Sequence, residues 1–191
     1  MHTPSDPTAA LAALIAGNQR HVQRRAQGRA ASTPRPAPAT ARPFAVTIEI
    51  EPVMSPLTEL FDVSPEQVQS FVLQPGAHEM RSGRFEVVVP SEEELVRVVD
   101  GSVDALGFAL VVVLGRLRAQ AGVPDIAFAG VEQRCFAIAR RLLSSGGRLS
   151  GSVGNGGVRL VGAIVDEGDG RVHWLGEHPE QRVLVGPARS K

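Results

Sequence analysis

The sequence predicts an α/β fold in which a mostly parallel sheet is flanked by helices and ends in a C-terminal hairpin. Strand-like apolar segments alternate along the chain with helical patterns, as in parallel sheets. The run Phe108–Leu114 is continuously apolar, which is typical of a central strand covered on both faces. Near the C-terminus, Val158–Val165 and Arg171–Leu175 are separated by a short Gly- and Asp-containing turn, which indicates a hairpin.

Residues 1–42 are predicted to form an N-terminal arm that begins with a helix. Asp6 is a good capping residue, and the proline that follows it suits the first helical position. The helix ends near Gly28. Its apolar stripe consists of Leu11, Leu14, Ile15 and Val22. Gly17 lies inside the helix, where we expect glycine to cost about 1 kcal/mol relative to alanine.

The second part of the arm, Ala30–Arg42, is rich in proline and predicts an extended connector. No acidic residue occurs from Pro7 to Ile48, although this stretch contains six arginines. The arm could bind an anionic partner, or it could be a solvated helix face and linker that pair with an acidic surface of another subunit. We favour the second interpretation because no aromatic residues are interleaved for base stacking.

Residues 43–176 are predicted to form the α/β core, and residues 177–191 a C-terminal tail. The predicted strands are 44–50, 68–73, 84–90, 108–114, 158–165 and 171–175. The predicted helices are 56–62, 91–106 and one that starts at residue 125 or 131 and ends at 143. The Gly-rich segment 144–157 predicts a turn region, since it lacks the GK[ST] ending of a phosphate-binding loop.

Composition limits the classes of partner. The 20 basic and 20 acidic residues cancel, so net charge favours neither nucleic acid nor membrane. The longest apolar run is far shorter than the roughly 20 residues that a spanning helix needs. Cys135 is the only cysteine, no Cys/His cluster occurs, and we interpret Cys135 as a small core residue. We therefore expect a cytoplasmic protein with neither nucleic acid nor membrane as a partner.

Five segments, in this order, resemble the β-class carbonic anhydrase family. They are Leu14–Val22 (family L-x-x-G-N-x-R-F), Arg42–Val46 (the start of the first strand), Pro56–Asp62 (P-E-x-I-F-D), Gly101–Gly115 (G-S-L-E-Y-A…V-V-L-G) and Val161–Val172 (V-G-A-x-Y-D-x-x-T-G-x-V). The resemblance covers nearly the whole chain and implies the family's α/β fold.

The same resemblance implies that the zinc site is lost. Family members carry C-x-D-S-R after the first strand, and counting from Pro43 places Ile50, Pro52 and Met54 at its Cys, Asp and Arg positions. The family's H-x-x-C after V-V-L-G corresponds to Arg116 and Ala119. Aliphatic side chains offer zinc no donor, and a guanidinium repels it. We therefore expect no zinc, no other cofactor and no metal-bound hydroxide.

Three functions follow as hypotheses. The first is a non-catalytic β-carbonic anhydrase homologue that acts as a structural or interaction subunit, as a homodimer or with a paralogue, through the N-terminal helix. The second is an anion-binding module that holds bicarbonate at Arg116, although we favour an arginine that pairs with a local carboxylate or extends to solvent. The third is an enzyme of the carbonate dehydratase family with residual or altered activity.

Overall fold

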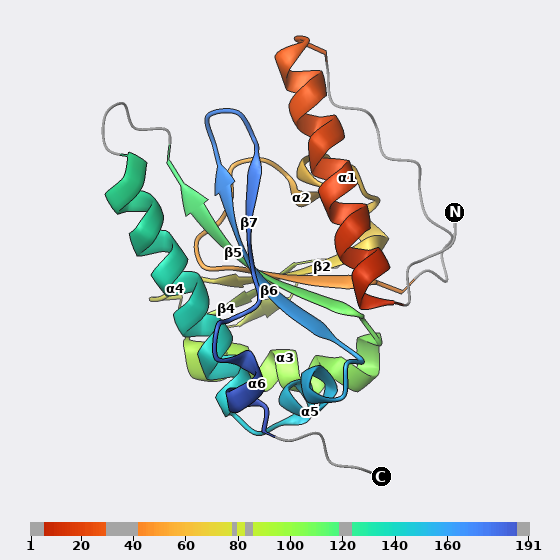
Figure 1. Ribbon diagram of the computed structural model, residues 1–191, viewed down its shortest axis with the longest axis vertical. Helices are drawn as coiled ribbons and strands as arrows, with labels where there is room; N and C mark the ends of the chain where they lie inside the picture. The colour runs from red at the N-terminus through yellow and green to blue at the C-terminus, as the bar shows by residue number, and fades with distance from the viewer. Residues whose placement is uncertain (1–5, 30–41, 78–79, 83–85, 119–123, 187–191) are drawn as a thin grey trace.

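The computed structural model describes residues 6–29, 42–77, 80–82, 86–118 and 124–186. It contains one seven-stranded sheet with the order β3-β4-β2-β1-β5-β6-β7 (Figure 1). The strands are β1 Ala45–Glu49, β2 Val68–Leu73, β3 Arg81–Ser82, β4 Glu86–Val89, β5 Leu110–Leu117, β6 Arg159–Asp166 and β7 Val172–Gly176. The five central strands are parallel, and β3 and β7 pair antiparallel at the two edges. The predicted fold class and C-terminal hairpin are confirmed.

Helices cover both faces of the sheet (Figure 1). They are α1 Pro7–Ala26, α2 Leu57–Leu60, the 3-10 helix η1 Pro65–Gln67, α3 Glu92–Leu106, α4 Pro124–Ser144, α5 Arg148–Gly154 and α6 Gln181–Leu184. The core under α1 and α2 includes Ala45, Leu110 and Leu114, whereas the core under α3, α4 and α5 includes Val46 and Ile48. Because neighbouring strand residues point to opposite faces, β1, β2, β5 and β6 contribute to both cores.

The predicted caps at the N-terminal ends of two long helices are present. The Asp6 carboxylate accepts a hydrogen bond from the Ala9 N–H at 2.8 Å, and α1 continues from it for 20 residues. The Ser91 hydroxyl accepts from the Glu94 N–H at 3.2 Å. Each cap satisfies a backbone donor that the helix itself leaves free. Three glutamates in the first turn of α3 add favourable charge at its N-terminus.

The α1 helix packs against its own chain, and part of its buried face is polar. Leu14 is fully buried, whereas the other members of the predicted stripe are only partly buried. Asn18 is buried and donates to the carbonyl oxygens of Leu60 (3.2 Å) and Gly170 (2.8 Å), while its own oxygen accepts from the Val172 N–H (3.0 Å). One amide thus joins α1 to α2 and to the β6–β7 hairpin.

Some local predictions are wrong or incomplete. The segment 144–157 is not only a turn, since α5 occupies Arg148–Gly154 despite its two glycines. Within the predicted tail, α6 forms at Gln181–Leu184. Both faces of β1 are buried, including the polar side chains of Thr47 and Glu49. Of the predicted connector, residues 30–41 lie outside the described residues, and the three-segment division of the chain stays a prediction.

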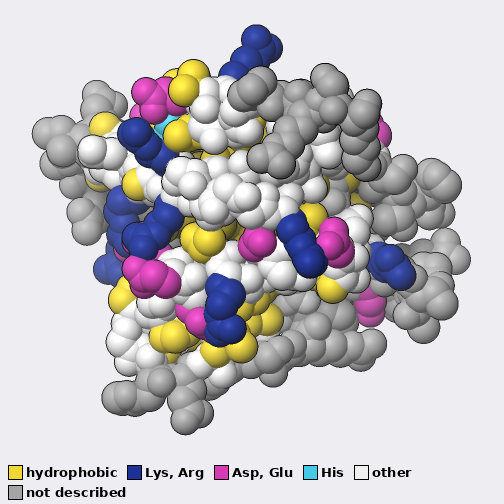
Figure 2. All heavy atoms as spheres, turned by 90° about the horizontal axis from the view of Figure 1, so that it is seen from below, with side chains coloured by type: hydrophobic (Ala, Val, Ile, Leu, Met, Phe, Trp, Pro, Cys, Tyr) yellow, Lys and Arg dark blue, Asp and Glu magenta, His cyan; other side chains and the backbone are white. Residues whose placement is uncertain are grey.

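The face that carries α3, α5 and α6 shows basic and acidic side chains next to one another, without a large area of one sign (Figure 2). Two of its ion pairs join Arg141 to Glu92 at 2.8 Å and Arg148 to Asp104 at 2.7 Å. The described basic side chains of this face therefore form no stripe of the kind that binds nucleic acid. Among the described helices, none is long and apolar enough to cross a membrane.

Candidate functional site

The sequence-predicted site lies at the carboxyl ends of β1 and β5, the edge of a parallel sheet where α/β proteins commonly place their sites. The two strands are neighbours, and Glu49 is the register partner of Leu114. Immediately after β1, the Ile50 N–H donates to the Leu114 carbonyl at 3.0 Å. The chain then turns through 51–56 into α2.

Of the predicted site residues that the structure describes, Pro52, Met54 and Arg116 take part in one polar network, whereas Ile50 points to the other face of the sheet. Ile50 is 4% exposed and belongs to the core under α3 and α4. Arg116 lies two residues after Leu114 in β5, so the two side chains point to the same face of the sheet. Leu114 belongs to the core on the opposite side from Ile50. Met54 is 77% exposed, although its N–H donates to a Glu167 carboxylate oxygen at 3.2 Å. Ala119 lies outside the described residues.

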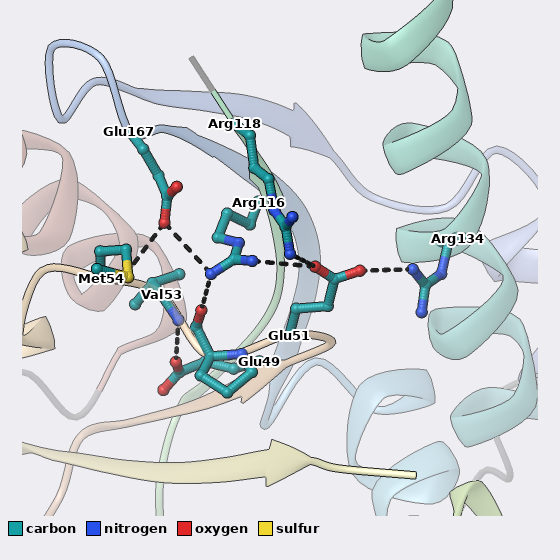
Figure 3. A network of polar contacts seen from close by, with 9 residues as sticks. Glu49, Glu51, Val53, Met54, Arg116, Arg118, Arg134 and Glu167 are labelled. Carbon is teal, nitrogen blue, oxygen red and sulfur yellow. Dashed lines mark hydrogen bonds and ion pairs between the residues drawn. The ribbon is translucent and has the colours of Figure 1, made fainter. Parts of the chain in front are cut away.

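Arg116 is the centre of a polar network (Figure 3). Its guanidinium, in a side chain 11% exposed, donates to the Pro52 carbonyl at 2.8 Å. It also pairs with Glu51 at 3.4 Å and with Glu167 at 3.6 Å. The cation is therefore held between two carboxylates, and its charge is compensated within the chain.

The network extends beyond Arg116 and crosses several elements (Figure 3). Glu51, which follows β1, also pairs with Arg134 of α4 at 2.9 Å and with Arg118 at 3.9 Å. Glu167 follows β6. The ion pairs thus tie the ends of three neighbouring strands to one another and to α4. An arrangement of this kind holds the loops after these strands in place. Its charged groups pair with one another and are therefore not free to bind a ligand.

The residues at the predicted site do not fit a zinc ion. Ile50 is an aliphatic side chain inside the core, and Arg116 brings a positive charge that is already paired. Zinc sites need thiolate, imidazole or carboxylate donors arranged as a tetrahedron. In the part of the chain that the structure describes, no three His, Cys, Asp or Glu side chains are grouped so as to hold a metal.

Glu49 is a site residue that the sequence analysis missed. The side chain is 5% exposed, and its two carboxylate oxygens accept from the Ser70 hydroxyl at 2.5 Å and from the Val53 N–H at 3.0 Å. Burial raises the pKa of Glu49, and the charge of Glu86 raises it further, whereas both hydrogen bonds oppose the shift. The sequence signal was an acidic residue between two core residues of one strand.

The raised pKa predicts how stability depends on pH. The folded state holds the Glu49 proton more tightly than the unfolded state, whose glutamate pKa is about 4.3. The contribution of Glu49 to stability is therefore present below that value and is lost as pH rises through the folded-state pKa. We expect wild type to lose stability relative to Glu49→Gln over this interval, as measured by urea unfolding at a series of pH values. A difference that stays constant across the series would contradict the assignment.

Cys135 behaves as a core residue, as the sequence predicted. It is fully buried in α4, and its sulfur lies 3.6 Å from the Ala163 carbonyl oxygen. Burial raises the pKa of the thiol to about 12, so the reactive thiolate is essentially absent at neutral pH.

Comparisons with known proteins find solved structures that are similar to this chain at low sequence identity. No family model matches the chain, and no curated protein matches it by sequence. Three β-carbonic anhydrases are similar in structure. The enzyme from Coccomyxa, solved in complex with acetazolamide, is 12% identical, with a TM-score of 0.45 and coverage of 72% of this chain and 73% of that one. The enzyme from Aspergillus fumigatus is 14% identical, with a TM-score of 0.46 and coverage of 70% and 76%. A tetrameric enzyme from Sordaria macrospora is 15% identical, with a TM-score of 0.41 and coverage of 88% and 93%.

Proposed function

We propose that this chain is a non-catalytic β-carbonic anhydrase homologue that acts as a structural or interaction subunit. The observation that carries the proposal is that Arg116 forms ion pairs with Glu51 and Glu167. It does so at the position where the family motif would supply a zinc ligand. The family's reaction requires a metal-bound hydroxide, and this position holds a paired cation instead. The site residues serve to hold strand ends together.

The interaction part of the proposal rests on α1. Its buried face is used within the chain, so a partner would meet the outer face, which is polar and basic. Exposed residues of α1 include Gln19, Gln23, Arg20 and Arg25. The Arg20 guanidinium already pairs with Asp62 at 2.5 Å, and Arg25 donates to the Gly168 carbonyl oxygen at 3.2 Å. A second subunit or a paralogue docking there would have to keep these contacts or offer acidic side chains in their place, because unpaired charges at an interface oppose association.

The bicarbonate alternative is weaker. The Arg116 side chain is only 11% exposed, and its two terminal nitrogens already contact three protein oxygens. An anion would have to displace Glu51 or Glu167 and would be repelled by the carboxylate that remained. We therefore expect bicarbonate to leave the thermal stability of the chain unchanged.

The decisive experiment is elemental analysis of the purified full chain together with a stopped-flow CO₂ hydration assay. We expect less than stoichiometric zinc after loading with the metal, and hydration at the rate of the buffer alone. Stoichiometric zinc accompanied by hydration activity would overturn the proposal and favour the enzyme alternative.

Two further measurements separate the remaining alternatives. Light scattering at micromolar concentration is expected to give a particle larger than a monomer, which a rise in salt concentration shifts towards monomer because charged surfaces meet. A monomer at every salt concentration would contradict the interaction role. A bicarbonate-dependent rise in melting temperature that Arg116→Met abolishes would replace the first proposal with the anion-binding one.

A further inference from the structure

A cavity of about 430 Å³ lies beside Glu49, between the end of β1, the start of α2 and the strand β2. Its volume falls in the range of small-molecule sites, roughly 300–1,000 Å³. The polar part of the lining includes Glu49, Ser70 and Glu86. The apolar part includes Val53, Leu57 and Val68.

The charge of the lining sets the chemistry of a ligand. Two carboxyl groups line the cavity, and among its described lining residues there is no lysine, arginine or histidine. Three other cavities in the described chain each include at least one arginine. Anions are therefore disfavoured beside Glu49, whereas a cation would be attracted by both carboxylates.

Among the described residues, Glu49 has no cationic partner of the kind that a buried carboxylate normally has. Its contacts in the described structure are hydrogen bonds from Ser70 and Val53, and no ion pair to it is found there. Each carboxylate oxygen has acceptor capacity for about two hydrogen bonds, so one remains on each oxygen. A buried charge without a counter-ion is costly, and it either takes up a proton or recruits a cation.

We propose that this cavity binds a small organic amine in its ammonium form. The ammonium group hydrogen-bonds to the remaining acceptor sites of Glu49 and lies within the field of Glu86. The apolar part of the amine packs on Val53, Leu57 and Val68. Apolar walls favour an alkylammonium over a hydrated metal ion, since a metal would need further oxygen ligands. This site goes beyond the proposed structural role and does not depend on it.

The test is calorimetric titration of the full chain with n-butylammonium, with n-butanol and butyrate as matched probes. We expect butylammonium to bind saturably with a millimolar dissociation constant. Butanol should bind about tenfold more weakly, because it loses a charged hydrogen bond. Butyrate should not bind. Butylammonium should bind more tightly as pH rises through the pKa of Glu49, because the carboxylate form is the one that binds; Glu86 is the other titratable group lining the cavity.

Variants locate the site. Glu49→Gln should weaken butylammonium binding by about tenfold, whereas Asp104→Asn, which removes an exposed acid that does not line the cavity, should leave it unchanged. If Glu49→Gln fails to fold, Glu86→Gln serves in its place and should weaken binding severalfold. No saturable binding, equal binding of butanol and butylammonium, or unchanged binding by the carboxyl variants would each overturn the proposal. None of these outcomes bears on zinc content or CO₂ hydration.

Discussion

Gly17→Ala is expected to lower the free energy of unfolding by about 2–3 kcal/mol, the usual cost of overpacking a close contact. A Cβ on Gly17 would lie 1.7 Å from the Phe61 carbonyl oxygen and 2.6 Å from its carbon. These are backbone atoms, so they cannot rotate away as a side chain would. The helix α1 would have to move away from α2, which would also lengthen the hydrogen bond from Asn18 to Leu60. This cost exceeds the gain of about 1 kcal/mol that alanine brings to a helix.

Gly130→Ala is the matched control, measured by the same urea unfolding. Gly130 lies within α4, and nothing would come within 4 Å of an added Cβ. We expect this variant to gain about 0.5–1 kcal/mol from helix propensity alone. If both variants shifted stability in the same direction, the close approach of α1 to Phe61 would not be what distinguishes Gly17.

Gly17 shows what the sequence could and could not predict about α1. The cap at Asp6 and the apolar spacing are local signals, and they placed the helix correctly. The same local reasoning treated Gly17 as a weak point. The reason for glycine there is the approach of Phe61, far along the chain, and the buried amide of Asn18 likewise depends on partners at Leu60 and Gly170. Such tertiary contacts have no period or composition from which they could be predicted.

The candidate site shows where such local reasoning stops. The strand β1 was predicted within one residue at each end, and counting from Pro43 placed the family's Cys position at Ile50, an assignment that stays a prediction. Successive residues of a strand point to opposite faces of the sheet. Ile50 lies in the core, while its neighbours Glu49 and Glu51 make the polar contacts. Which residue faces the site depends on pairing with β5, and the sequence alone does not contain that register.

Arg116→Met is expected to lower the free energy of unfolding by about 2–3 kcal/mol, because removing one partner of a largely buried ion pair leaves the others uncompensated. Two carboxylates, Glu51 and Glu167, would lose their cation, and the Pro52 carbonyl would lose its donor. Methionine keeps most of the side-chain volume, so the loss reports polar contacts and not a cavity. Urea unfolding at low and high salt measures it, and the shielded position of Arg116 predicts that little of the loss disappears in salt.

Arg118→Met is the control for this charge network, since Arg118 is 66% exposed and lies 3.9 Å from the same Glu51 carboxylate. An exposed pair of this kind contributes about 0–1 kcal/mol. Equal losses for the two variants would mean that Arg116 acts as one more surface charge, and the structural role of the network would be contradicted. Combining Arg116→Met with Glu167→Gln in a double-mutant cycle isolates their coupling. A large coupling energy is expected, because the two residues join the ends of β5 and β6 directly, and it would identify the network as the element that now holds these strand ends together.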